Sequence, residues 1–164
     1  MNAPHEPRLN RAVRMLLQTQ RVAALGTLDA ERKPFVSMVP FGVDRQAGHF
    51  IIHTSLLAPH TRNLLDDPVV SLMVMQAEIP KEPVHALPRL SMNGTAHRLP
   101  PGSPAWQTAR SVYLARFPEA QAMTELGDFS FFALHVSEAR QVAGFGAARR
   151  LDADEMATLL KWQD

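Results

Sequence analysis

The chain of 164 residues contains no cysteine and has almost no excess of either charge. Without cysteine there are no disulfide bonds, thiolate metal ligands or thiol nucleophiles. The 17 basic residues nearly balance the 16 acidic ones, which leaves a formal net charge of +1. Proteins that bind nucleic acid usually carry a broad basic surface, so we expect no nucleic acid partner.

Long hydrophobic runs are also missing. The longest apolar stretch, 69–75, is interrupted by Ser71 and is far shorter than the roughly 20 residues of a membrane-spanning helix. Residues 1–7 lack the apolar core of a signal peptide. Together with the missing cysteine, these features predict a soluble, cytoplasmic protein without a membrane partner.

The composition that remains, with 46% hydrophobic and 20% charged residues, is typical of a globular protein. A chain of this length forms one ordinary domain. We therefore expect a single domain over 1–164, with a flexible N-terminus over about residues 1–8.

The spacing of apolar residues is helical near the N-terminus and then changes to strand-like runs joined by short turns. This pattern predicts an α+β fold, mainly β, in which antiparallel strands form a small barrel with flanking helices. The near-continuous apolar run 69–75 predicts a strand that is buried on both faces. The expected strands are 22–28, 35–43, 49–54, 69–75, 89–98 and 129–136, and the expected helices are 8–19, one starting at Pro59, 104–117 and one starting after Asp152.

Two features near the C-terminus help to place its elements. Residues 141–145 form either a seventh strand or a continuation of the sixth strand past a bend, and Gly144 and Gly146 indicate a glycine-rich bend. Asp152 and Glu155 have the spacing of a capping box, which predicts the start of the last helix.

The segment 54–64 has an unusual arrangement of charge. Pro59 suits the first position of a helix, yet His60 and Arg62 follow at the electropositive start and Asp66 lies at the electronegative end. An anion such as a cofactor phosphate, bound to the free amides of the first turn and to nearby hydroxyl groups, would compensate for this reversal. A solvated surface helix with a weak Arg62–Asp66 pair explains the spacing equally well.

Other candidate sites carry weaker signals. The strand 89–98 alternates cleanly, with Arg89, Ser91, Asn93, Thr95 and His97 on one face. That polar face either meets solvent or contacts a cofactor or a second subunit. The seven histidines show neither HxH nor HExxH spacing, so we expect no metal site.

Six segments, taken in order, carry a resemblance to a known family. They are 24–28, 34–41, 54–64, 67–72, 89–96 and 144–146. The chain resembles the pyridoxamine 5′-phosphate oxidase-like, FMN-binding split barrels, and is most similar to the haem-utilisation branch of that superfamily. The stretch His60-Thr61-Arg62-Asn63 is the most specific part of the match.

The resemblance implies a six-stranded antiparallel split β-barrel that forms a homodimer with two FMN sites at its interface. The implied function is that of a flavoprotein oxidoreductase acting on a small-molecule redox substrate, and no catalytic residue can be named. By this likeness Ser37, Met38, Val39 and Pro40 run beside the flavin ring, His53, Thr54, Ser55, His60, Thr61, Arg62 and Asn63 hold the ribityl chain and phosphate, and Arg89 reaches in from the partner subunit.

The alternative is a haem-binding, haem-utilisation protein that uses the same dimer cleft, with His53, His60 or His97 as an iron ligand. Haem-degrading relatives place a ligating histidine in a C-terminal loop, whereas no histidine follows His135 in this chain. Pyridoxamine phosphate oxidases carry basic residues near the positions of Ser37 and Gly42, which are neutral here. We therefore do not expect pyridoxal phosphate synthesis.

Overall fold

The computed structural model describes residues 6–163. The expected flexible N-terminus, 1–8, lies largely outside the described residues. Within the described part, Glu6 accepts a hydrogen bond from Arg14 at 2.8 Å, and the first helix begins at Arg8. No helix in residues 6–163 has the length and apolar character needed to cross a membrane.

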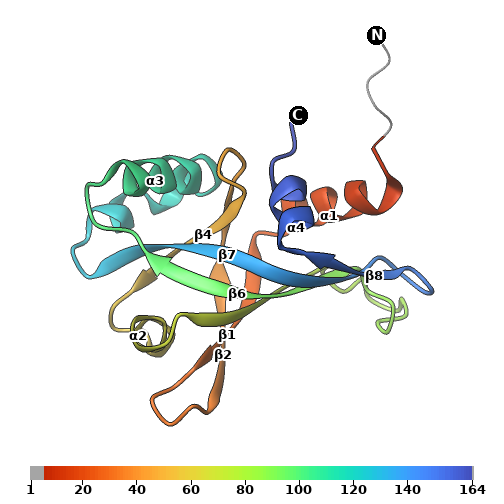
Figure 1. The fold of residues 1–164 in the computed structure, drawn as a ribbon, viewed down its shortest axis with the longest axis horizontal. Coiled ribbons are helices and arrows are strands. Elements are labelled where there is room, and N and C mark those ends of the chain that lie inside the picture. Colours follow the sequence, from red (N-terminus) through yellow and green to blue (C-terminus); the bar gives the residue numbers. More distant parts are fainter. Residues whose placement is uncertain (1–5, 164) are drawn as a thin grey trace.

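One antiparallel sheet of eight strands organises the fold, in the order β2-β1-β5-β6-β7-β4-β3 with β8 paired to β7 (Figure 1). The strands are β1 (Val22–Leu28), β2 (Pro34–Pro40), β3 (Gly42–Asp44), β4 (His49–Ser55), β5 (Val69–Met75), β6 (Arg89–Arg98), β7 (Phe129–Val142) and β8 (Ala148–Asp152). The helices are α1 (Arg8–Thr19), α2 (Pro59–Asp66), α3 (Pro104–Arg116) and α4 (Ala153–Leu160), with short 3₁₀ turns η1 (Pro118–Ala120) and η2 (Ala122–Glu125).

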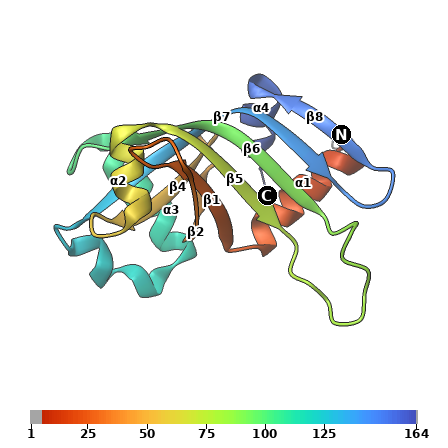
Figure 2. The same ribbon diagram turned by 90° about the horizontal axis from the view of Figure 1, so that it is seen from below.

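The sheet curls around the main hydrophobic core. Strands β2 and β4 contact each other without pairing, so the barrel is split along this line. Helices α1 and α4 pack against each other and against the sheet (Figures 1 and 2). Leu17, Phe41, Phe50, Leu90 and Met156 are among the fully buried side chains of this core.

A second, smaller core lies between α3 and the opposite face of β4 and β7. It contains Ile51 and Phe131 from the sheet and Ala109, Tyr113 and Phe117 from the α3 region. Because successive strand residues point to opposite faces, β4 contributes Phe50 and Ile52 to the barrel core and Ile51 to the core under α3.

The split barrel with flanking helices agrees with the prediction, but its strand count does not. The expected strand 35–43 is divided at Phe41, whose backbone lies between β2 and β3. The expected strand 129–136 continues to Val142, and β8 then returns beside it after the bend at Gly144. Six expected strands thus become eight.

The prediction that residues 69–75 are buried on both faces is wrong. Val70, Leu72 and Val74 point into the barrel core, whereas Val69 and Met75 are exposed on the other face. The apolar run had suggested two covered faces, but only one is covered by other elements of this chain. An apolar surface is therefore left open on the outside of the sheet.

The last helix begins as its sequence predicts. Asp152 accepts a hydrogen bond from the Glu155 amide at 2.9 Å, and the Glu155 carboxylate accepts one from the Asp152 amide at 2.8 Å. This complete capping box fixes the junction between β8 and α4.

Candidate functional site

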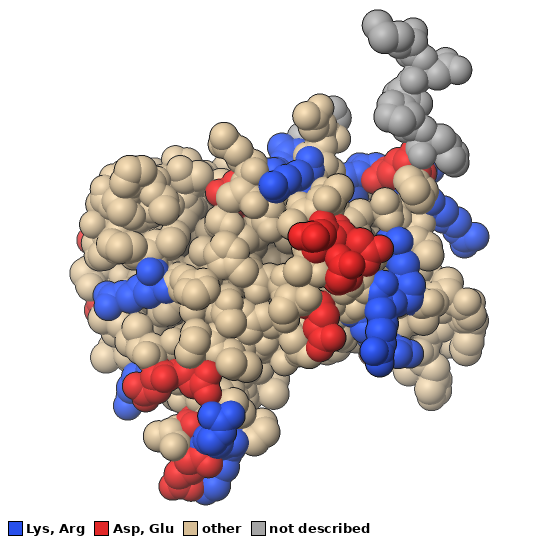
Figure 3. All heavy atoms as spheres, viewed as in Figure 1, with Lys and Arg blue, Asp and Glu red and all other residues tan. Residues whose placement is uncertain are grey.

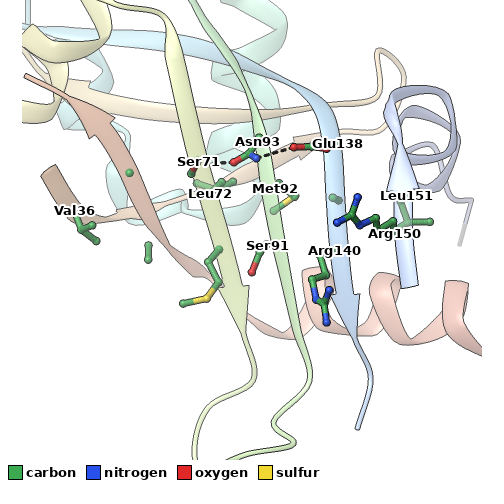
Figure 4. Close-up of a pocket in the computed structure, with 14 residues that line it drawn as sticks. Val36, Ser71, Leu72, Ser91, Met92, Asn93, Glu138, Arg140, Arg150 and Leu151 are labelled. Atoms are coloured by element: carbon green, nitrogen blue, oxygen red, sulfur yellow. Dashed lines mark hydrogen bonds between the residues drawn. The ribbon is translucent and has the colours of Figure 1, made fainter. Parts of the chain in front are cut away.

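A cavity of about 580 Å³ lies on the outer face of the sheet (Figure 4). Its surface is mainly apolar, with small side chains such as Ala24 and Gly26 beside the longer Val36 and Met73. The cavity is lined by Ala24, Gly26, Val36, Ser71, Leu72, Met73, Ser91, Met92, Asn93, Glu138, Ala139, Arg140, Arg150 and Leu151.

A hydrogen-bonded row of polar side chains crosses three strands at this cavity. Ser71 Oγ on β5 donates to Asn93 Oδ1 on β6 at 2.7 Å, and Asn93 Nδ2 donates to Glu138 Oε1 on β7 at 2.9 Å (Figure 4). The amide of Asn93 is thereby fixed in orientation, with the carboxylate of Glu138 at one end of the row.

A β-bulge decides which side chains of β7 reach the cavity. Asn93 pairs with Glu138 and Gly94 with Val136, so Ser137 is an extra residue on β7. Its hydroxyl donates to the Asn93 carbonyl at 3.1 Å. Before the bulge the even-numbered residues of β7 face the barrel core, and after it the odd-numbered ones do. Ala139 is consequently buried and Arg140 points outward.

Two arginines stand opposite each other at the edge of the cavity. Arg140 on β7 pairs in register with Arg150 on β8, and like charges directly opposite each other destabilise a sheet. Neither guanidinium has a hydrogen bond or ion pair with another described residue, whereas the adjacent Arg149 donates to Gln141 and Asn10, both at 2.7 Å. Figure 3 shows basic side chains gathered in this region beside a group of acidic ones.

The residues predicted to hold a phosphate lie at the end of the barrel near α2. Helix α2 contacts β1 and β2, and Asn63 Nδ2 donates to Thr27 Oγ1 at 2.9 Å in the interior. Ser37, Thr54 and Thr61 each have a buried hydroxyl oxygen without a hydrogen-bond partner. Because buried polar groups are normally paired, these three hydroxyls, two of them near α2 and Ser37 in the middle of β2, fit a bound polar ligand.

The start of α2 is less open to an anion than expected. The amides of Thr61 and Arg62 both donate to the Ala58 carbonyl, at 3.1 and 3.4 Å, so they are not free. Arg62 is exposed and donates to the Leu57 carbonyl at 3.2 Å. Partial burial lowers the pKa of His60 below its usual value, which disfavours the charged form that would attract an anion.

The strand residues of the predicted set point in different directions. On β2, Ser37 and Val39 face inward, whereas Met38 is exposed on the outer face and Pro40 ends the strand. Ser55, at the end of β4, donates to Asp128 Oδ2 at 3.3 Å and accepts from the Leu57 amide at 3.1 Å.

His53 belongs to the core under α3 and not to the barrel interior that Thr54 faces. Its ring is 4.2 Å from that of Phe131, 5.0 Å from that of Phe129 and 5.6 Å from that of Tyr113, measured between centroids. This burial lowers its pKa to about 4, so the imidazole is neutral at physiological pH.

Arg89 lies at the opposite end of the sheet from α2. It pairs with Met75 and Val142 and donates to the Leu87 carbonyl at 3.1 Å. The length of β5 separates this end from α2, a distance of about 20 Å for a strand of this size. Within one chain, Arg89 and α2 therefore do not meet at one ligand.

None of the flavin-site residues implied by the family resemblance lines the large cavity. Ser37 and Met38 instead line an adjoining apolar groove with Val22, Val36 and Met75. The polar face noted on the strand 89–98 was the signal in the sequence that pointed to the cavity, since Ser91 and Asn93 both line it. Arg140 and Arg150 were missed because the bulge and β8 were not foreseen.

The histidines of residues 6–163 lie outside the cavity as well. His49, His97 and His135 lie together on the sheet surface, with ring centroids of His135 4.8 Å from His49 and 5.3 Å from His97. Among residues 6–163, no group of three or more histidine, aspartate or glutamate side chains has the arrangement needed to hold a metal ion.

The curled antiparallel sheet, its flanking helices and the large outer cavity define a split β-barrel protein. The family model described as pyridoxamine 5′-phosphate oxidase matches residues 9–143. The chain belongs to this family, within its haem-utilisation branch.

Three relatives illustrate this placement. Haem oxygenase HutZ of Vibrio cholerae is 30% identical over 158 residues, which cover 96% of this chain and 89% of HutZ. The chloroplast haem oxygenase HOZ of Arabidopsis thaliana is 35% identical over 118 residues, or 72% of this chain and 34% of HOZ. The solved structure of a haem-binding protein from Mycobacterium smegmatis has a TM-score of 0.82 and 27% identity, covering 93% of this chain and 61% of that protein.

Proposed function

We propose that this protein binds haem in the cavity on the outer face of its sheet and acts in haem utilisation. The observation that carries the proposal is the combination of an apolar floor and two unpaired arginines in one cavity of about 580 Å³. Haem is a large flat ring with an apolar surface and two carboxylates at one edge. Cavities that bind such ligands are mostly apolar, with a few polar groups that fix orientation.

The names of the relatives support the same proposal, that this protein binds haem. HutZ and HOZ are haem oxygenases by name, and the Mycobacterium smegmatis structure is that of a haem-binding protein. The residues that would hold the ring are the outer side chains of β1, β5 and β6, with Met73 and Ser91 among them. Haem supplies redox chemistry at its iron when bound, and this chain supplies the surface that shields one side of the ring.

We further propose that the protein acts as a homodimer. Val36 and Met38 on the outer face of β2 are 69% and 62% exposed, and Val22 and Met75 extend the apolar surface across β1 and β5. Contiguous exposed apolar surface of this kind marks a protein contact. A second copy placed over it would also cover the cavity, because Val36 and Met73 line both the groove and the cavity.

A second candidate is FMN, which would place its phosphate near the start of α2. The unpaired buried hydroxyls of Ser37, Thr54 and Thr61 favour this ligand. An oxidoreductase reaction on a small-molecule substrate would then follow from the flavin. If FMN binds there, Thr61→Val should weaken its binding, measured by quenching of flavin fluorescence. Without a ligand the same change removes an unpaired hydroxyl and should not lower stability.

Haemin titration of the purified chain tests the main proposal. We expect a saturable shift of the Soret band and its loss in Ser91→Trp, which fills the cavity from the exposed face of β6. Thr95→Trp is the matched control, because Thr95 lies on the same strand and face but outside the cavity. Haemin binding by Ser91→Trp equal to that of the unmodified protein would contradict the proposal. FMN binding without haemin binding would favour the second candidate.

A further inference from the structure

The cavity combines a cross-strand pair of arginines with a lining that contains no histidine or cysteine among the described residues. Arg140 on β7 and Arg150 on β8 are directly opposed, and neither has an ion pair with a described acidic residue, while the lining offers no strong ligand for iron. Arginine is the side chain best suited to planar, bidentate recognition of a carboxylate. These features suggest a site that recognises the acidic edge of its ligand more than the metal at the centre.

We propose, on the basis of the haem-binding function above, that Arg140 and Arg150 bind the two carboxylates of a tetrapyrrole and that binding does not require iron. The ligand class is therefore a planar dicarboxylic tetrapyrrole, with or without a metal. The ring lies over the outer surface of β1, β5 and β6, and its acidic edge points toward the β7–β8 hairpin.

The pairing of the two arginines is the first step of the argument. Their Cβ atoms are about 5 Å apart in a directly opposed antiparallel pair. Positively charged side chains on directly opposed residues repel each other, and a neighbouring pair of carboxylates would turn the repulsion into two charge-assisted contacts. Arg149, one residue away, shows the contrast, because its guanidinium is already satisfied by Gln141 and Asn10.

The acidic residue of the cavity does not neutralise this pair. Glu138 lies on the same face of β7, two residues before Arg140, but its Oε1 accepts from Asn93 Nδ2 at 2.9 Å. The row formed by Ser71, Asn93 and Glu138 thus holds the carboxylate on the β6 side, away from β8 (Figure 4). In the proposed complex the carboxylates of the ligand contact the two arginines. The ring of the ligand contacts the neutral members of the row, Ser71 and Asn93.

The lack of a histidine in the cavity is the second step. His53 is enclosed under α3, and His49, His97 and His135 lie on another part of the sheet. Of the thioethers, Met92 is buried in the barrel core and Met73 lies in the lining. Recognition by this chain therefore rests on apolar contact and on carboxylate charge, and both are unchanged when iron is removed.

Three ligands separate the contributions: haemin, iron-free protoporphyrin IX, and the dimethyl ester of that porphyrin, which has no free carboxylate. Each is titrated into the full chain, with absorbance and porphyrin fluorescence as readouts. We expect iron-free protoporphyrin IX to bind within about tenfold of haemin and the dimethyl ester to bind at least about tenfold more weakly than the free acid.

The variant Arg140→Gln/Arg150→Gln should weaken haemin and free protoporphyrin equally, by about tenfold or more, and leave the dimethyl ester unchanged. Arg8→Gln, which removes an exposed arginine that does not line the cavity, is the control for net charge and should change none of the three. Circular dichroism of the double variant verifies that it is folded.

The inference is overturned if haemin binds but free protoporphyrin binds more than about a hundredfold more weakly, since iron would then dominate, for instance through a histidine of a second copy. Equal binding of the ester and the free acid also overturns it. If none of the three ligands binds, the proposed function itself fails, so the two failures are distinguishable.

Discussion

Some side chains of this protein lie in surroundings that the local sequence does not reveal. His53 is the clearest case: it is 7% exposed, surrounded by Phe129, Phe131 and Tyr113, and its Nδ1 has no hydrogen-bond partner among the described residues. The cost of placing a charge in that environment lowers its pKa to about 4. Its neighbours explain why the residue behaves as a core aromatic ring.

His53 should therefore make the stability of the protein depend on pH. Its folded-state pKa is below the unfolded value near 6.5, so the unfolded state binds more protons between these limits. The stabilisation is complete above pH 6.5 and falls as the pH drops toward 4, by about 2 to 3 kcal/mol. Urea unfolding of the unmodified protein and of His53→Phe between pH 4 and 7.5 measures this difference.

The comparison isolates one histidine from the others. His53→Phe should lose part of the acid sensitivity and be more stable than the unmodified protein at pH 5. His85→Phe, at an exposed loop position, is the control and should keep the original pH dependence. Identical pH profiles for His53→Phe and the unmodified protein would show that the core under α3 does not hold a neutral imidazole.

At the scale of elements, the bulge in β7 determines which side chains of that strand reach the cavity. It shifts the alternation of the strand by one residue, so Ala139 is buried while Glu138 and Arg140 reach the cavity. The bulge is accompanied by a close approach of two backbones. A Cβ added to Gly94 on β6 would lie 2.0 Å from the His135 carbonyl oxygen, which no side chain can accommodate.

Gly94→Ala should therefore destabilise the protein by more than about 2 kcal/mol, because β6 and β7 must move apart at the bulge. The midpoint of urea unfolding measures the effect. Gly127→Ala is the matched control, since a Cβ there meets no atom within 4 Å. If Gly94→Ala is as stable as the control, the bulge is not at the position described.

For the molecule as a whole, the main question is what covers the outer face of the sheet. The barrel core and the core under α3 are closed by this chain, whereas the outer surface of β1, β2 and β5 remains apolar and open. Exposed apolar surface of this kind is costly for a lone protomer in water. We attribute it to the dimer contact proposed above.

Val36→Lys/Met38→Lys should therefore convert dimers to monomers, because it places two charges in the centre of that surface. Sedimentation velocity or light scattering at a fixed protein concentration gives the mass. Ile79→Lys/Val84→Lys, in the exposed loop between β5 and β6, makes the same chemical change away from the contact and should leave the mass unchanged. An unmodified protein that is monomeric at high concentration would refute the dimer directly.

Much of the fold follows from local patterns in the chain. The helices 8–19 and 59–66, the strands 22–28 and 69–75 and the capping box at Asp152 lie where periodicity, Pro59 and cap residues place them. These signals are local because helix caps and alternation depend on residues a few positions apart. The same is true of the polar face of 89–98, whose alternation the structure confirms.

The candidate site was much harder to predict from sequence. The charges near Arg62 drew attention to α2, where two of the first-turn amides are already bonded to Ala58. The large cavity is built instead from residues of six strands, with Ser71, Asn93, Glu138, Arg140 and Arg150 among them. Residues so distant in sequence come together only through strand order and register.

The sequence by itself determined most of the helices and strands, the barrel class and the family resemblance, because each rests on short-range spacing or on ordered motifs. Only the tertiary structure decided that one face of Val69–Met75 stays uncovered, that Ser137 inserts a bulge, and that Arg140 meets Arg150. The physical reason is that alternation assigns each side chain to one of two faces, whereas pairing across strands and packing of helices decide which face is covered. A single extra residue in β7 then reverses that assignment, and it places two positive charges at the edge of an apolar cavity.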